Sequence, residues 1–284
     1  ITVTAFTAAD GIESGFIFDI CQDRQNRLWL ATFGAGINIL EQKGESIKVS
    51  LITKEDGIPS DIILGLDEDK EGDIWVGTYD AGAFKMIISG ADSGKIYSYN
   101  LINGINDNRV WSIITDRQGA VWFGTDEGGL NRFRNSQFVA FTEQTGLPNN
   151  RILCVFEDKD GIIWAGTNGS GLCKFNRDHL AHYSENDGLS NNQISGIVQD
   201  QSGNYWLSSQ NGLTQMTFLN SQPLCRSYTT DDGLINNNVK SIAYANDGTL
   251  WIATDGGISR MKPPGWNDKA TGLNKSTLEF KNYS

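Results

Sequence analysis

The stretch that decides the fold runs Gly146-Leu147-Pro148-Asn149-Asn150, continues through Asp158-Lys159-Asp160-Gly161 and ends at Trp164-Ala165-Gly166-Thr167. The same pattern occurs six times along the chain, and each copy is centred on one tryptophan. These residues are Trp29, Trp75, Trp122, Trp164, Trp206 and Trp251, which are 46, 47, 42, 42 and 45 residues apart. Self-similarity at such a period indicates a repeat architecture. Two further tryptophans, Trp111 and Trp266, lie outside the register.

Each copy predicts four short strands. The first is β-branched and short, as in residues 109–115, which is typical of a buried inner strand. In the turn that follows, Asp lies six residues and Gly three residues before Trp, a spacing typical of a type I turn ended by a left-handed residue. Asn26 replaces the first Gly and tolerates the left-handed region. The Asp is expected to accept hydrogen bonds from backbone N–H groups ahead of it, and only the last copy replaces it, with Ala245. The fourth strand, as in residues 137–141, is polar enough for an outer edge.

Four antiparallel strands per unit and one aromatic residue per unit predict an all-β fold, a β-propeller. A long solenoid is disfavoured, because parallel β-helix repeats are usually shorter. Six tryptophans predict six blades in a single domain that spans residues 1–284. Residues 3–7 and 280–284 both have the pattern of a fourth strand, so one is surplus and a seventh blade is the alternative. Residues 263–276 are interpreted as an insertion, and the extra residues 220–223 are expected in a loop between the third and fourth strands.

The composition excludes several function classes. A content of 39% apolar residues can form a core, whereas 23 Lys and Arg against 34 Asp and Glu give a net charge of −11. Nucleic acid is therefore not an expected partner. No apolar run reaches the roughly 18 residues of a membrane-spanning helix, so this chain is not expected to insert into a membrane. Any signal peptide or anchor is expected outside these 284 residues.

Residues typical of metal or acid–base chemistry are sparse. The two histidines, His179 and His182, are three residues apart on a predicted outer strand, so they point to opposite faces and cannot bind one metal ion. Cys154 and Cys173 fall on the first and third strands of one blade, about 10 Å apart and beyond disulfide reach. Free thiols are expected for all four cysteines, and neither a metal nor a cofactor is predicted. The four are Cys21, Cys154, Cys173 and Cys225.

Candidate ligand-binding residues lie where inner strands begin and where second strands turn into third strands, around the predicted mouth of the propeller channel. The position five residues after the repeat glycine is occupied by Phe16, Ile62, Arg109, Arg151, Gln193 and Asn238. The turns that face these positions contribute Phe33, Tyr79, Asp80, Asp126, Glu127, Asn168, Gln210 and Asn211. The predicted site consists of Arg109, Arg151, Gln193, Asn238, Phe33, Tyr79, Asp80, Asp126 and Glu127.

These residue types favour binding over catalysis. Aromatic rings with carboxylates and amides can stack on a sugar and form hydrogen bonds with it, and Arg109 with Arg151 could hold an anionic substituent by bidentate contacts. Two turn carboxylates could instead form a glycosidase pair, for which Asp80, Asp126 and Glu127 are available with Asp255. Solvated turn acids explain the same residues without catalysis, so no catalytic residue is predicted.

The repeat resembles a known family. Gly-Leu-Pro-Asn-Asn-x-Ile at residues 146–152, Asp-x-x-Gly-x-x-Trp-x-Gly-Thr at residues 158–167 and Gly-Gly-Leu-x-Arg-Phe at residues 128–133 are similar to the two-component regulator propeller repeat. The similarity spans residues 6–261. It implies the extracytoplasmic, commonly periplasmic, sensor propeller of a bacterial membrane histidine kinase, often one tuned to glycans. The four free cysteines expected here are an argument against an oxidising compartment.

The predicted function is therefore a non-enzymatic sensing or binding propeller, with a soluble oligosaccharide or another small ligand as partner. A homodimer is compatible with the resemblance. The alternatives are a scaffold for protein–protein interaction and, third, a polysaccharide-acting enzyme. A fold by itself selects none of these.

Overall fold

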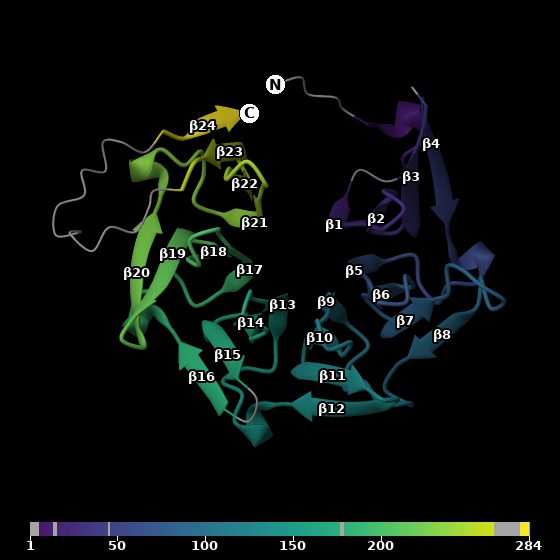
Figure 1. The fold of residues 1–284 in the computed structure, drawn as a ribbon, viewed down its shortest axis with the longest axis horizontal. Helices are drawn as coiled ribbons and strands as arrows, with labels where there is room; N and C mark the ends of the chain where they lie inside the picture. The colour runs from purple at the N-terminus through teal and green to yellow at the C-terminus, as the bar shows by residue number, and fades with distance from the viewer. Residues whose placement is uncertain (1–5, 14–15, 45, 177–178, 264–278, 284) are drawn as a thin grey trace. The chain divides into compact units, whose positions relative to one another are not determined.

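The computed structural model describes residues 6–13, 16–44, 46–176, 179–263 and 279–283. Its strands form six antiparallel sheets of four strands each, and in each sheet the strands follow chain order (Figure 1). We refer to these sheets as blades 1 to 6. The protein is therefore an all-β, six-bladed β-propeller, as the tryptophan register predicts.

The strand bounds follow the repeat. Blade 1 contains β1 (Ile17–Gln22), β2 (Leu28–Thr32), β3 (Ile37–Lys43) and β4 (Ser46–Ile52). Blade 2 contains β5 (Ile63–Glu68), β6 (Ile74–Thr78), β7 (Ala83–Met86) and β8 (Ile96–Tyr99). Blade 3 contains β9 (Val110–Thr115), β10 (Val121–Thr125), β11 (Leu130–Arg134) and β12 (Gln137–Phe141). Blade 4 contains β13 (Ile152–Glu157), β14 (Ile163–Thr167), β15 (Leu172–Asn176) and β16 (His179–Tyr183). Blade 5 contains β17 (Ile194–Gln199), β18 (Tyr205–Ser209), β19 (Gly212–Leu219) and β20 (Gln222–Tyr228). Blade 6 contains β21 (Val239–Tyr244), β22 (Leu250–Thr254), β23 (Gly257–Met261) and β24 (Lys281–Tyr283).

Short 3₁₀ helices precede the inner strands of five blades, but not β9 of blade 3. In the described residues these are η1 (Ala8–Asp10), η2 (Lys54–Asp56), η3 (Glu143–Thr145), η4 (Glu185–Asp187) and η5 (Thr230–Asp232). At η2, the Thr53 side chain caps the first turn and Gly57 ends it at a φ of 97°, which is why the repeat places glycine there. None of the described helices is long and apolar enough to cross a membrane.

The chain divides into two compact units. Unit 1 comprises residues 1–142 with 150–152, and unit 2 comprises residues 143–149 with 153–284. Unit 1 therefore holds blades 1 to 3 and the start of β13, and unit 2 holds the rest. The prediction of a single domain over residues 1–284 stays a prediction.

The turn between the first and second strands explains the repeated Asp and Trp. In blade 2, Oδ1 of Asp69 accepts the backbone N–H groups of Glu71 and Asp73, both at 3.0 Å, as expected. The sequence reasoning missed the role of the other carboxylate oxygen, which accepts the indole N–H of Trp75 at 3.0 Å. The same indole bond occurs in four other blades, at 2.8 to 3.0 Å, in the pairs Asp23–Trp29, Asp116–Trp122, Asp158–Trp164 and Asp200–Trp206. One Asp thus fixes both the turn and the ring.

These buried carboxylates are stabilised in the charged form. Burial by itself would raise the pKa of Asp23, Asp69 and Asp158. Hydrogen bonds from the indole and backbone groups, together with Arg27 at Asp23 and Lys85 at Asp69, outweigh burial and hold each pKa below its usual value.

Four of the repeated tryptophans, Trp29, Trp75, Trp164 and Trp206, pack between neighbouring blades within a unit, as predicted. Trp29 of blade 1 lies in one apolar cluster with Ile63 and Leu66 of β5. In unit 2, Trp164 packs with Ile194 and Ile197 of β17 in the same way. The inner strand of one blade is therefore buried by the tryptophan of the blade before it. In β1, by contrast, Ile17 and Ile20 occupy the same repeat positions and are exposed.

Of the predictions for the chain ends and loops, the structure confirms the fourth strand at the C-terminal end but not the loop at residues 220–223. β24 pairs with β23 and supplies the fourth strand predicted for residues 280–284. Of the rival strand at residues 3–7, only Phe6 and Thr7 are described, and Thr7 caps η1. The predicted insertion lies outside the described residues except for Pro263. The predicted loop at residues 220–223 is wrong, because the extra residues lengthen β19 and β20 and leave only Asn220 and Ser221 in the turn.

Candidate functional site

The predicted strand starts and turns meet at one end of each blade, because antiparallel neighbours place the start of the first strand beside the end of the second. In blade 1 the N–H of Phe33 donates to the carbonyl of Phe16 at 3.1 Å. In blade 3 the N–H of Asp126 donates to the carbonyl of Arg109, also at 3.1 Å. Side chains from the two predicted sets are therefore neighbours within a blade.

A β-bulge sits at this end of the inner strand. In blade 3, Val110 pairs with Thr125 and Ser112 pairs with Gly124, so Trp111 is an extra residue between them. A bulge re-aims the extra side chain. The register shifts at the same place in blades 1, 2, 5 and 6, where the extra residues are Phe18, Leu64, Ser195 and Lys240.

The bulge residue reaches the turn of its own blade. The ring centroids of Phe18 and Phe33 are 5.6 Å apart in blade 1. The indole N–H of Trp111 donates to Oδ1 of Asp126 at 3.0 Å in blade 3. We call these contacts bulge–turn pairs. The sequence reasoning missed Phe18 and Trp111, although a tryptophan outside the register and two residues after Arg109 was a signal.

Asp126 is the centre of the candidate site. This buried carboxylate accepts Nη1 of Arg109 at 2.7 Å and Nε of Arg151 at 2.8 Å, in addition to the indole of Trp111. Two guanidinium groups thus share one carboxylate, so the three ionised groups carry a net charge of +1. The side chains of Arg109 and Arg151 remain 33% and 42% exposed, so solvent reaches both cations. We call Asp126, Arg109 and Arg151 the arginine pair site.

An aromatic row continues from the arginine pair site. The guanidinium carbon of Arg109 lies 4.0 Å from the ring centroid of Tyr79, close enough for a cation–π contact. Tyr79 meets Phe33 edge to face with centroids 6.0 Å apart, and Phe33 in turn meets Phe18. Phe33 and Phe18 are 44% and 50% exposed. All of these residues belong to unit 1.

The structure therefore brings together five of the nine predicted site residues, Phe33, Tyr79, Arg109, Asp126 and Arg151. Asp80 instead accepts a hydrogen bond from Oγ of Ser60 at 2.5 Å. The Glu127 side chain is exposed, while its backbone N–H donates to Asp107.

The other two predicted residues, Gln193 and Asn238, belong to unit 2. The backbone N–H of Gln193 donates to Asn191, and the amide of Asn238 donates to Asp255 at 2.5 Å. Whether all nine residues form one ring stays a prediction.

Metal and nucleophile chemistry has little support in the described residues. His179 and His182 both lie on the outer strand β16, as predicted. Within the described ranges no group of three His, Cys, Asp or Glu side chains is placed to hold a metal ion. All four cysteines are free thiols. Burial raises the pKa of Cys154 and Cys173 to about 12, so neither thiol forms a nucleophilic thiolate near neutral pH.

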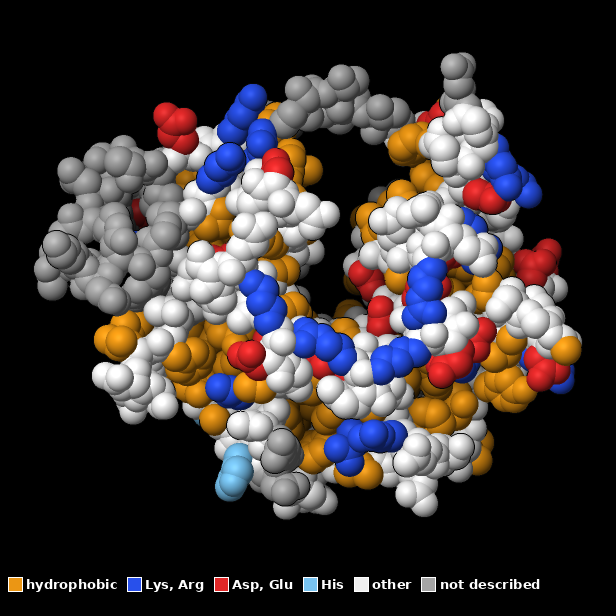
Figure 2. Space-filling view, viewed as in Figure 1, with side chains coloured by type: hydrophobic (Ala, Val, Ile, Leu, Met, Phe, Trp, Pro, Cys, Tyr) orange, Lys and Arg blue, Asp and Glu red, His pale blue; other side chains and the backbone are white. Residues whose placement is uncertain are grey.

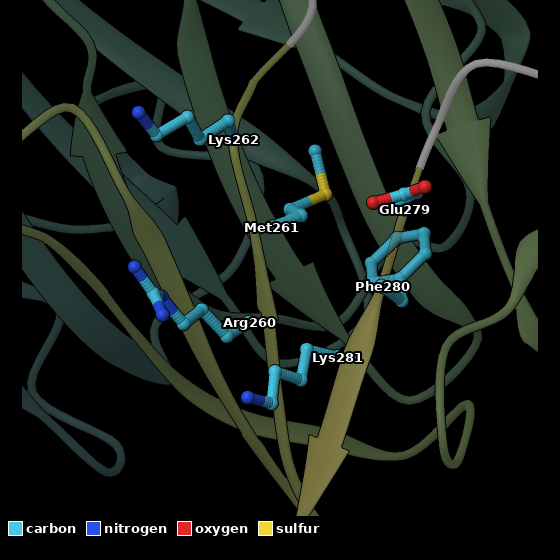
Figure 3. Close-up of a pocket in the computed structure, with 6 residues that line it drawn as sticks. All are labelled: Arg260, Met261, Lys262, Glu279, Phe280 and Lys281. Atoms are coloured by element: carbon cyan, nitrogen blue, oxygen red, sulfur yellow. The ribbon is translucent and has the colours of Figure 1, made fainter. Parts of the chain in front are cut away.

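A separate cavity of about 390 Å³ lies beside β23 and β24. Figure 3 shows the charged ends of Arg260 and Lys262 on one side of it and Phe280 with Glu279 on the other. Its lining residues adjoin residues 264–278, which are outside the described part of the chain. The arginine pair site is therefore the better-defined candidate.

Comparison with known proteins agrees with the repeat pattern. The family model of the two component regulator propeller matches six times, at residues 11–34, 57–80, 104–127, 146–169, 188–211 and 233–256. No curated protein sequence is detectably similar to the chain.

Solved structures share the fold at low sequence identity. The extracellular domain of the hybrid two component system BT4673 from B. thetaiotaomicron is 17% identical, with a TM-score of 0.63 over 94% of this chain and 43% of that chain. Virginiamycin B lyase from Staphylococcus aureus is 15% identical, with a TM-score of 0.70 over 94% of this chain and 84% of that chain. PorZ, a surface component of the type-IX secretion system of Porphyromonas gingivalis, is 16% identical, with a TM-score of 0.64 over 93% of this chain and 41% of that chain. This chain thus spans less than half the length of the first and third of these proteins.

Proposed function

Because this chain belongs to the two-component regulator propeller family, we propose that it is a ligand-sensing propeller that binds an oligosaccharide and performs no catalysis. We further propose an extracytoplasmic, periplasmic location, which the extracellular domain among the structural neighbours supports. Since a shared fold does not fix a function, the ligand class depends on the site itself.

The observation that carries the proposal is the shared carboxylate between two arginines. Asp126 holds Arg109 and Arg151 in place through charge-assisted hydrogen bonds of 2.7 and 2.8 Å. Guanidinium groups fixed in this way lose little side-chain entropy when they bind an oxygen-rich ligand. Hydroxyl and anionic oxygens of a sugar are acceptors that suit such donors, and the neighbouring rings of Tyr79 and Phe33 can contact its C–H faces.

The position of the histidines supports binding rather than lyase chemistry. A virginiamycin B lyase variant described as catalytically inactive has a histidine replaced by alanine. The only histidines of this chain, His179 and His182, both lie on the outer strand of blade 4. No histidine is therefore part of the arginine pair site.

The experiment compares the wild type with the Arg109→Ala, Arg151→Ala double variant. Oligosaccharides are first screened on a glycan array, and the best ligand is then titrated by calorimetry. We expect at least a tenfold loss of affinity in the double variant, since hydrogen bonds to charged groups contribute about 1.5 to 3 kcal/mol each. Arg134→Ala is the matched control, because Arg134 is an exposed arginine at the end of β11 in the same unit.

Unchanged affinity in the double variant would place the ligand elsewhere. If the wild type binds no saccharide but captures a protein through these arginines, the scaffold alternative replaces the sensor. Turnover of a bound saccharide by the wild type would contradict the non-catalytic assignment.

A further inference from the structure

Within the proposed function, we infer that the site takes an acidic oligosaccharide lengthwise. In this arrangement the acidic group binds Arg109 and Arg151, and the adjoining sugar rings lie on Phe33 and Phe18.

The aromatic row is continuous. Contacts run from Phe18 to Phe33 at 5.6 Å, from Phe33 to Tyr79 at 6.0 Å, and from Tyr79 to Arg109 at 4.0 Å. Each step between rings is about the size of one sugar ring. Every member belongs to unit 1, in blades 1 to 3, so the row is one surface.

The row is charged at one end. Its cationic end consists of Arg109 and Arg151 around Asp126, whereas the rings of Phe18 and Phe33 at the other end carry no charge. A row with its guanidinium groups at one end favours a ligand with its anion at the same end. A sugar chain that ends in a uronic acid or a sulfated sugar has this distribution.

The arginine pair site itself keeps a positive charge. Asp126 neutralises one of its two guanidinium charges, which leaves one to bind an anionic group. The net charge of −11 does not prevent this, because screening limits its reach to roughly 8 to 10 Å in physiological salt. Figure 2 also shows Lys and Arg side chains beside Asp and Glu side chains on the displayed face, rather than a single acidic surface.

Two phenylalanines of the row are exposed to solvent. Phe18 and Phe33 are about half exposed, and covering an apolar ring of this size would lower the free energy. Phe18 is directed to Phe33 by the bulge of β1. The C–H faces of sugar rings could cover both while their hydroxyl groups remain in water.

The test is a length series measured by calorimetry. Galacturonate, and a disaccharide and a trisaccharide of galactose that end in one galacturonate, are titrated into the wild type, alongside the neutral galactose monomer, dimer and trimer, with galactose 6-sulfate as the sulfate arm. We expect the acidic trisaccharide to bind at least tenfold more tightly than galacturonate, and the neutral trimer at least tenfold more weakly than the acidic trisaccharide. Tighter binding of the sulfate than of the monomeric carboxylate identifies the sulfated class.

Two variants separate the row from the arginines. Phe33→Ala and Phe18→Ala should reduce the gain from monomer to trimer to less than threefold while the monomer affinity stays within twofold. The control is Tyr97→Ala, an exposed aromatic residue on β8, which should leave the gain intact. A thermal melt confirms that each variant is folded.

Two outcomes overturn the inference and are distinguishable from failure of the proposed function. If the length gain survives both Phe substitutions, the row is not the subsite, although loss of binding in the arginine double variant still supports the function. If a neutral oligosaccharide binds as tightly as the acidic one through the same arginines, the acidic class is wrong and the function again stands. If the arginine double variant loses no affinity for any saccharide, the proposed function fails as well.

Discussion

Blades 3 and 6 carry the same repeat but keep different parts of it. In blade 3 the indole of Trp122 donates to Asp116 at 2.8 Å, and both residues are buried. In blade 6, Ala245 stands at the Asp position and Trp251 is only half-buried. The backbone of the turn is nevertheless preserved, since Gly248 donates to the carbonyl of Ala245 at 2.9 Å. The glycine and the strand register are therefore enough to form the turn, and the Asp additionally fixes the tryptophan ring through a hydrogen bond to its indole N–H.

The bulge–turn pair is likewise buried in blade 3 and exposed in blade 6. In blade 3, Trp111 donates to a buried Asp126 that also holds two arginines. In blade 6, Lys240 and Asp255 form an ion pair at 3.2 Å, with their side chains 55% and 51% exposed. Exposed pairs of this kind contribute little, whereas a buried carboxylate must be paired. The comparison indicates that the same β-bulge positions a buried, fully paired carboxylate in blade 3 and a solvent-exposed ion pair in blade 6.

The largest expected effect comes from the two tryptophans. Trp122→Ala should lower the free energy of unfolding by about 3 to 5 kcal/mol, because a buried ring leaves a cavity. Trp251→Ala should cost about half as much or less, since its ring is partly solvated and lacks the Asp partner. Urea unfolding followed by fluorescence measures both. Equal losses would mean that the two blades bury their tryptophans alike.

The second prediction compares the two turn carboxylates. Asp126→Ala should cost about 2 kcal/mol, because two arginines and an indole lose their shared acceptor; their partial exposure keeps the cost below that of a fully buried pair. Asp255→Ala should change stability by less than about 0.5 kcal/mol. Chemical denaturation of the two variants side by side gives the difference. A costly Asp255→Ala would show that exposure does not separate the two sites.

The third prediction concerns Asp67 of blade 2, whose carboxylate forms a hydrogen bond with the backbone of blade 3. Oδ2 of Asp67 accepts the backbone N–H of Thr115, whereas Val198 occupies the Asp67 position in front of blade 6. Burial raises the pKa of Asp67 to about 6; the Thr115 bond lowers it in part, and the neighbouring Asp19 raises it further. Because the folded state then binds the proton more tightly than the unfolded state, stability falls as pH rises from about 4 to about 6.

Asp67→Asn should reduce this slope, and the remainder belongs to Asp19, whose pKa burial also raises. We expect the variant's unfolding free energy to change less between pH 4 and pH 7 than that of the wild type, by on the order of 1 to 3 kcal/mol. Thermal melts across this range measure the effect. The carboxylates with lowered pKa values, such as Asp69, titrate below this window and serve as the internal reference. A wild-type slope that persists in the variant would assign the titration to another group.

The smallest expected effect is a gain. Ala245→Asp restores the missing acceptor in blade 6, where the turn already has the backbone bonds of its relatives. A new hydrogen bond to the Trp251 indole should stabilise the protein by about 0.5 to 1 kcal/mol. The gain should disappear when Trp251 is replaced by Phe, which lacks the indole N–H. A gain that remains in the Phe background would have another origin.

Much of the fold could be predicted because the same repeat pattern specifies every blade. The spacing of Asp, Gly and Trp places the first turn and the second strand in most copies, with Asn26 for Gly in the first and Ala245 for Asp in the last, and the outer strands follow from their polarity. The error at residues 220–223 has a physical reason: extra residues between two strands can extend both strands as well as form a loop, and the hydrophobic pattern does not distinguish these outcomes.

The site could be predicted less completely. Antiparallel pairing was enough to place Arg109 beside Asp126 and Phe16 beside Phe33. The bulge was not predictable: one extra residue inverts the alternation beyond it, but an inner strand such as β9 has apolar residues on both faces, so the inversion leaves no pattern in the sequence. Phe18 and Trp111 were therefore missed, and with them the bulge–turn pairs.

The central claim is that ligand binds at the arginine pair site of blade 3 and along the row beside it. The most direct measurement is a crystal structure of the protein with a bound galactose trisaccharide that ends in one galacturonate. We predict the terminal carboxylate within hydrogen-bond distance of Arg109 and Arg151 and the next rings on Phe33 and Phe18. A ligand bound instead at Lys240 and Asp255 in blade 6, or in the cavity beside β23 and β24, with the arginine pair site occupied only by water, would contradict the claim.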